Sequence, residues 1–188
     1  MMTQPQTGTN RFRLKKRVVL VTPLVIVILV AVFAYVYYSM SLASVTRISL
    51  DQIQAVRIFG AGTFPNRNVT YILEVQVWSK AQTLDVSLKA PTFLADADAV
   101  PLGNQTLADG IIIKGAYLTY NLRFSINESK VIGPNPSASD MGLRMVSWVG
   151  AGFYSRTVTL FTSTIWNWTT AKLIVSGGCF DITFNIGC

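Results

Sequence analysis

One uninterrupted apolar stretch near the N-terminus dominates the pattern of hydrophobic and polar positions. Val18–Tyr38 contains twenty-one residues and no charged side chain. At about 1.5 Å per residue, a helix of this length reaches about 31 Å, the thickness of a hydrocarbon core. The pattern therefore predicts a transmembrane helix at residues 18–40. Thr22 and Pro23 suit a helix cap and first helical position, so we expect the ordered helix to begin at Pro23.

The residues around this stretch bear on its processing and orientation. Ser41 and Ala43 supply the small side chains that a signal peptidase reads, which leaves a cleaved signal open. A signal core has only about 7–15 apolar residues, so the longer stretch favours an uncleaved signal anchor. Five basic residues lie just before it, at Arg11, Arg13, Lys15, Lys16 and Arg17. This asymmetry predicts a cytoplasmic tail at residues 1–17, disordered over Met1–Asn10, and an extracellular domain at residues 41–188.

After the apolar stretch the period of the pattern changes to two, which is typical of β-strands with one buried face. Leu118–Ile126 alternates most clearly, and Val69–Val77 follows the same rule. Shorter alternations indicate further strands at residues 84–88, 158–160 and 180–186, and less distinct ones at residues 45–50 and 55–59, where a helix also fits.

Turn-forming residues such as Gly60, Asp109-Gly110 and Gly133–Pro136 separate the alternating segments. Six to eight short strands with this spacing predict an antiparallel β-sandwich, so the fold class is mainly β with one N-terminal transmembrane helix. Ser137–Met145 breaks the alternation, and we expect a short helix or a crossover there.

The net charge of +7 is unevenly distributed. Five of the sixteen basic residues precede the apolar stretch, which leaves eleven against nine acidic residues in the remainder. This near balance removes the electrostatic footprint of a nucleic-acid-binding domain. The predicted partners are instead the lipid bilayer, through Val18–Tyr38, and proteins at the cell surface, including further copies of the chain.

Four N-glycosylation sequons are compatible with an extracellular domain. They begin at Asn68, Asn104, Asn127 and Asn167, at expected strand ends or loops. Chance alone would produce about one or two sequons in a chain of this composition. We expect at least two of the four to carry a glycan.

Cys179 and Cys188 are the two cysteines of the chain. In an extracellular domain an even pair suggests a disulfide. If residues 180–186 form one straight strand, about 30 Å separates the two sulfur atoms, far beyond disulfide reach. A bond therefore requires the chain to double back near Asn185–Gly187, and pairing with another chain remains the alternative.

The residue types present exclude the histidine-dependent classes of catalytic chemistry. The chain has no histidine, so catalytic triads and histidine-based metal sites cannot form. Asp96 and Asp98 could contribute to a calcium site, but an ordinary solvated turn explains them better. We predict no enzymatic activity, no metal and no cofactor. Trp148 is expected in the core, whereas Trp166 and Trp168 flank a sequon and are expected to form an exposed contact surface.

Three consecutive segments, YILEVQVWS at Tyr71–Ser79, LDVSLKAPTFL at Leu84–Leu94 and the strongly alternating Gly110–Ile126, resemble the water-stress and hypersensitive-response domain of late-embryogenesis-abundant-like proteins. The resemblance covers about residues 45–126 and implies a β-sandwich of late-embryogenesis-abundant-like or immunoglobulin-like type without catalytic residues. Members with a membrane tether are similar in layout to this chain.

A second resemblance is to archaeal type IV pilins and related filament subunits. It rests on the basic N-terminus, the apolar helix that begins at Thr22–Val25, and a sequon-bearing β-domain. The segment Val18–Val21 departs from the usual processing site of such pilins. The sequence therefore predicts a membrane-anchored extracellular module with a non-catalytic binding, structural or stress-protective role, or an accessory subunit of a surface assembly. The alternative is a pilin-like filament subunit.

Overall fold

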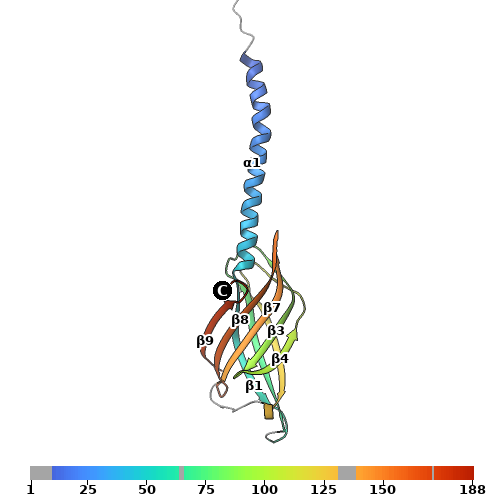
Figure 1. Ribbon diagram of the computed structural model, residues 1–188, viewed down its shortest axis with the longest axis vertical. Helices are drawn as coiled ribbons and strands as arrows, with labels where there is room; N and C mark the ends of the chain where they lie inside the picture. The colour runs from blue at the N-terminus through green and yellow to red at the C-terminus, as the bar shows by residue number, and fades with distance from the viewer. Residues whose placement is uncertain (1–9, 64–65, 131–138, 171) are drawn as a thin grey trace, which may run out of the picture. The chain divides into compact units, whose positions relative to one another are not determined.

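The computed structural model describes residues 10–63, 66–130, 139–170 and 172–188 (Figure 1). For residues 10–20 it describes the backbone only. The chain divides into two compact units, Met1–Ser39 and Met40–Cys188, one residue from the predicted start of the β-domain. The predicted disordered tail, Met1–Asn10, lies outside the described residues except for Asn10, which is helical, so the prediction is wrong at that residue.

A single helix, α1, extends from Asn10 to Thr46 and contains Pro23 in its interior. The expectation that the helix begins at Pro23 is therefore wrong. A proline removes one backbone N–H, but the turns on either side keep their hydrogen bonds, and an apolar segment offers its backbone no better partner than the helix. From Val21 to Thr46 the helix is long and apolar enough to cross a membrane.

The second unit is built from two antiparallel sheets, which confirms the predicted mainly β fold. The smaller sheet has the order β1-β2-β6, and the larger has the order β10-β9-β8-β7-β3-β4, with β5 also paired to β3. The smaller sheet consists of β1 (Ile48–Phe59), β2 (Asn68–Ser79) and β6 (Leu118–Asn127), followed by the short 3-10 helix η1 (Glu128–Lys130). The larger consists of β3 (Val86–Ala97), β4 (Val100–Thr106), β5 (Gly110–Ile112), β7 (Ser139–Ala151), β8 (Tyr154–Asn167), β9 (Lys172–Asp181) and β10 (Ile186–Gly187).

Apolar side chains from both sheets form one core between them. Leu73 of β2 and Leu122 of β6 are fully buried, as are Leu88, Leu143 and Leu160 from the larger sheet. The period-two alternation thus places one face of each sheet in a shared core, as two packed layers require.

Two segments differ from the sequence-based expectation. Residues 48–59 form the single strand β1, so the strand expected at residues 55–59 is confirmed, and the one expected at residues 45–50 is confirmed from Ile48 onward. The two are parts of one strand, and Val45 and Thr46 still belong to the helix. The expected helix or crossover at Ser137–Met145 is wrong from Ser139 onward, because β7 begins there. Strand β7 pairs on both sides, with β3 and β8, and these ladders satisfy its backbone.

Two tight turns define the ends of the sandwich. The basal end carries residues 40–46 and the β7–β8 turn. This turn consists of Gly152, which has a φ of +52°, and Phe153. The distal end carries the β3–β4 turn, where Asp98 and Ala99 have φ of +49° and +63°. Two positive φ values in a two-residue loop match the right-handed twist of the strands that it joins.

Candidate functional site

A row of side chains crosses the outer face of the larger sheet. Strand register aligns Asn104 with Leu94, Leu94 with Arg144, and Arg144 with Phe161. Four strands, β4, β3, β7 and β8, thereby bring an amide, an aliphatic group, a guanidinium and an aromatic ring into one line. Positions this distant in sequence meet only through sheet pairing.

A hollow of about 440 Å³ opens on this face. Its lining consists of Leu94, Ala95, Asp96, Pro101, Gly103, Asn104, Gly142, Arg144 and Phe161. Gly142 is essential to its shape, because a Cβ there would lie 1.9 Å from Asp96 Oδ1. The glycine therefore allows the carboxylate to lie across the floor of the hollow.

Opposite charges line the hollow without neutralising each other. Among the described residues, neither Asp96 nor Arg144 has an ion-pair partner within 4.0 Å. Arg144 is exposed and Asp96 is half-buried. A carboxylate that accepts and a guanidinium that donates are thus both available to a bound molecule, beside the apolar surfaces of Leu94 and Phe161.

The negative potential of this region extends to the nearby Asp140. Partial burial raises the pKa of the Asp140 carboxyl, and the negative charges of Asp96 and Asp98 raise it further. Asp98 itself accepts hydrogen bonds from Ser139 Oγ at 2.7 Å and from the Asp140 backbone N–H at 2.9 Å. The Asp98 carboxylate therefore connects the β3–β4 turn to the start of β7, while the Asp96 carboxylate faces the hollow.

The described residues contain no group of three or more His, Cys, Asp or Glu that could hold a metal ion. The carboxylates of Asp96 and Asp98, which were considered as calcium ligands, have different surroundings. That of Asp96 faces the hollow, and that of Asp98 accepts hydrogen bonds from Ser139 and Asp140. The predictions of no metal, no cofactor and no catalysis stay predictions.

The sequon asparagines fall into two groups. Asn68, Asn127 and Asn167 lie at the first or last residue of their strands towards the distal end, and Asn68 pairs with Asn127. Asn127 Oδ1 accepts a hydrogen bond from Ser129 Oγ at 2.6 Å, within its own sequon. Asn104 instead lies inside β4 and lines the hollow, so a glycan there would occupy the space above it.

Trp166 is not part of an exposed surface, and that prediction is wrong. Its side chain is 1% exposed, because even-numbered residues of β8 from Val158 onward point into the core. Its indole N–H is hydrogen-bonded to Thr164 Oγ1 at 2.8 Å and to Gln52 Oε1 at 3.3 Å. Gln52 also donates to the Met141 carbonyl at 3.1 Å, and these polar groups link β1 to the opposite sheet.

Trp168 and Trp148 also differ from the sequence-based expectation. Trp168 is half-buried and packs edge-on against Tyr71 with ring centroids 5.5 Å apart, so at most part of its surface is available for contacts. Trp148 lies on the outer face of the larger sheet beneath Lys89 Nζ, and the expectation of a core residue is wrong.

Cys179 and Cys188 form an intrachain disulfide with Cα atoms 5.2 Å apart. The straight strand expected at residues 180–186 is wrong, because β9 ends at Asp181 and the turn at residues 182–185 returns the chain to β10. Thr183 N–H donates to Asp181 Oδ1 at 2.9 Å and tightens this turn. The disulfide requires the chain to reverse direction. The reversal begins at residue 182, three residues before the expected position at Asn185–Gly187.

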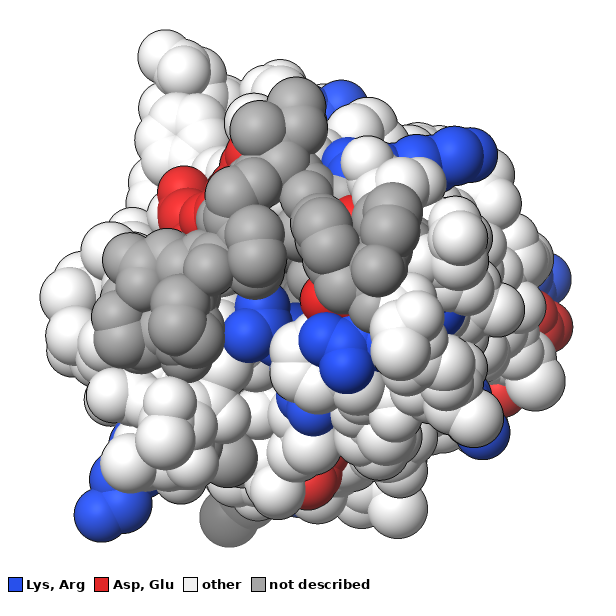
Figure 2. Space-filling view, turned by 90° about the horizontal axis from the view of Figure 1, so that it is seen from below, with Lys and Arg blue, Asp and Glu red and all other residues white. Residues whose placement is uncertain are grey.

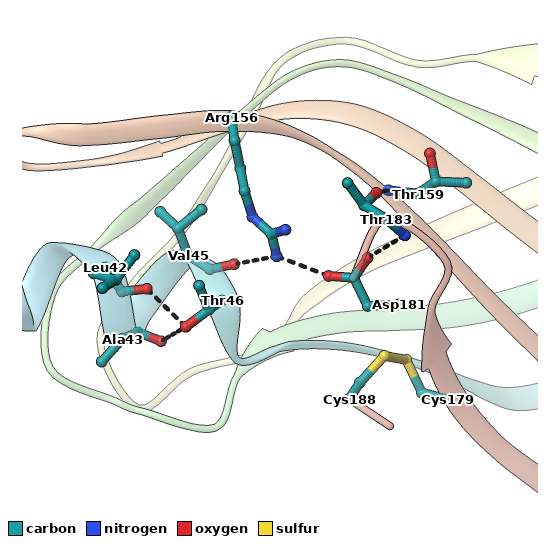
Figure 3. A network of polar contacts seen from close by, with 10 residues as sticks. All are labelled: Leu42, Ala43, Val45, Thr46, Arg156, Thr159, Cys179, Asp181, Thr183 and Cys188. Carbon is teal, nitrogen blue, oxygen red and sulfur yellow. Dashed lines mark hydrogen bonds and ion pairs between the residues drawn. A yellow bond between two sulfur atoms is a disulfide. The ribbon is translucent and has the colours of Figure 1, made fainter. Parts of the chain in front are cut away.

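Sequence analysis missed a buried polar cluster at the basal end (Figure 3). Arg156 Nη2 donates to Asp181 Oδ2 at 2.7 Å, with side chains 10% and 2% exposed, and lies 3.5 Å from the Val45 carbonyl oxygen. The guanidinium also lies over the Phe184 ring, 4.1 Å from its centroid. An arginine at a core-facing position of β8 was the available signal, since a buried charge requires a partner.

Comparisons with known proteins add little to this description. No family model matches the sequence, and no curated protein matches it. A crystal structure of a protein from Archaeoglobus fulgidus shares 7% identity over 62% of this chain and 97% of its own, with a TM-score of 0.34. The resemblances to late-embryogenesis-abundant-like domains and to pilins stay predictions.

Proposed function

We propose that this chain is a single-span, membrane-anchored β-sandwich module that faces the outside and acts by non-catalytic binding. The hollow over Gly142 is its binding site, and a neutral saccharide unit is the ligand class that fits. The observation that carries this proposal is that Asp96 and Arg144 line one hollow and form no ion pair within the described part of the chain.

The character of the lining favours a neutral ligand. A molecule that carries a single charge would neutralise only one of the two groups and leave the other desolvated, which is costly. A sugar ring offers hydroxyl groups that donate to Asp96 and accept from Arg144, and a flat apolar face that suits the ring of Phe161. The size of the hollow falls within the range of small-molecule sites, about 300–1,000 Å³.

Support for the anchor comes from the apolar part of α1. The large side chains between Val21 and Tyr38 are exposed, and such a surface requires lipid or protein around it. The basic residues that precede the apolar stretch favour retention of the N-terminus in the cytoplasm.

Extraction and mass spectrometry test the anchor. The full chain should resist alkaline carbonate, dissolve in detergent as a discrete species, and retain an intact N-terminus. A new terminus within Arg17–Val21, together with sedimentation as a polymer, would replace the proposal with the pilin-like alternative. A terminus just after Ala43 would identify a cleaved signal and exclude the anchor.

Saccharide binding is tested with the full chain in nanodiscs on an array of neutral mono- and oligosaccharides. The background variant Asn104→Gln keeps the amide but prevents glycosylation from covering the hollow. Asp96→Asn and Arg144→Gln should each weaken binding by roughly ten-fold, the loss of a hydrogen bond to a charged group.

Matched controls are available on the outer face of the smaller sheet. Glu74 is half-buried and Arg123 exposed, as Asp96 and Arg144 are, and neither control residue lines the hollow. Glu74→Gln and Arg123→Gln should leave binding unchanged. If the control variants lost as much saccharide affinity as the Asp96 and Arg144 variants, or if no saccharide bound at all, the proposed binding site would be refuted.

A further inference from the structure

Large apolar side chains are exposed together at the basal end of the sandwich. Phe153 is 72% exposed, Ile113 62% and Tyr117 56%. With Ile111, Ile182 and Phe184 they form a group that we name the basal rim. A soluble surface rarely carries such a group without a partner.

Two aromatic residues of the basal rim are one or two contacts from residues 40–46. Phe153 N–H donates to Ser41 Oγ at 3.3 Å. Phe184 lies against Arg156, which reaches the Val45 carbonyl as described above. The rim therefore lies level with the last turns of α1 that belong to the β-domain.

The loop from Ile113 to Tyr117 is connected in the same way. Lys114 N–H donates to Asp85 Oδ1 at 2.7 Å, next to Leu84, whose N–H donates to Ser44 Oγ at 3.2 Å. The ring of Tyr117 packs on Trp78, with centroids 5.3 Å apart. Ser44 is fully buried, so this loop is held against the first residues of the domain.

We infer that the basal rim inserts into the interfacial layer of the same bilayer that holds α1. The inference rests on the proposed anchoring, because Met40 lies two residues after Tyr38, the end of the apolar stretch that the anchor places in the bilayer. The rim therefore cannot lie far from the lipid surface. Aromatic and aliphatic side chains at this depth bury their apolar surface among headgroups and acyl chains, typically to about 5–10 Å.

The charges beside the rim are compatible with an anionic lipid surface. Arg47 and Lys114 are exposed at the basal end, as is Lys80, whose Nζ donates to the Cys188 carbonyl oxygen, and Asp85 is an exposed carboxylate beside Lys114. At the distal end, which faces the viewer in Figure 2, Lys and Arg are interspersed with Asp and Glu. Each basic group near an anionic membrane contributes about 1 kcal/mol of attraction.

Depth-dependent quenching tests this insertion in the full chain. Both native cysteines are in the disulfide, so a single introduced cysteine is the only reactive thiol. Phe153→Cys carries an environment-sensitive fluorophore, and Phe59→Cys, at the far end of β1, is the matched control. Ile113→Cys provides an independent position in case the first variant is misfolded. The chains are reconstituted in vesicles of phosphatidylcholine and phosphatidylglycerol that contain a lipid with a shallow spin-label quencher.

The fluorophores at residues 153 and 113 should lose roughly half or more of their emission, and the one at residue 59 should not, because only the former lie in the interfacial layer. Equal quenching at the basal and distal positions in chains that resist carbonate extraction would overturn the insertion alone. Release of the chain by carbonate would overturn the insertion and the proposed anchor together.

Discussion

The buried ion pair between Arg156 and Asp181 allows a quantitative test of the basal cluster (Figure 3). Asp181→Asn keeps the shape of the side chain and the hydrogen bond from Thr183 but removes the negative charge. The Arg156 guanidinium, 10% exposed, then remains buried without a counter-charge. It cannot lose its proton, so the cost falls on the folded state. Breaking a buried pair in this way destabilises by about 3–5 kcal/mol.

The double variant Arg156→Met with Asp181→Leu separates the charge effect from loss of packing. It removes both charges and should recover most of the lost stability, to within about 1–2 kcal/mol of the wild type. Urea unfolding of the full chain in detergent micelles, followed by tryptophan fluorescence, measures both variants. A single variant within about 0.5 kcal/mol of the wild type, or a double variant no better than the single one, would refute the reasoning.

Three further predictions concern other parts of the domain. Replacing Cys179 and Cys188 by Ser should lower the unfolding free energy by about 2–3 kcal/mol in the same urea assay, because the short loop they close gains freedom when unfolded; no change would show that the turn alone holds the chain end. The hydrogen bond from Arg67 lowers the pKa of Glu128, so its stabilisation is present at neutral pH and is lost as pH falls from the unfolded pKa through the folded one. The stability difference between wild type and Glu128→Gln should thus narrow as pH falls below the ordinary Glu pKa of 4.5 in pH-dependent thermal melts, and a constant difference would contradict this sign. Gly142→Ala should displace the carboxylate on the floor of the hollow and weaken saccharide binding by roughly ten-fold, and unchanged binding on the array would show that the floor is not a contact.

Strands with one buried face were predictable from the sequence. Residues 118–126 and 69–77 were expected, and β6 and β2 extend them by at most two residues at either end. Strand β7 was missed because its alternation is broken on both faces. Gly142 and Trp148 occupy its outer face, while the small polar Ser147 is buried on the inner face and donates to the Lys89 carbonyl at 3.1 Å.

The candidate site could not be predicted because strand register creates it. Leu94, Arg144 and Phe161 belong to no motif along the chain, and Asn104 was singled out only as a sequon asparagine; the four residues become neighbours only through three ladders. Trp166 illustrates the opposite case. Trp166 has the parity of the buried Val158 and Leu160, but the alternation was recognised only at residues 158–160, and the adjacent sequon at Asn167 was taken as a signal for exposure.

The orientation of the β-domain is the central claim, and labelling of intact cells measures it directly. The chain with Phe59→Cys, whose added thiol lies at the distal end, is exposed to a membrane-impermeant maleimide before and after permeabilisation. An uncleaved, outward-facing module predicts full labelling of the intact, carbonate-resistant chain before permeabilisation. Labelling that appears only after permeabilisation would place the domain in the cytoplasm and contradict the account.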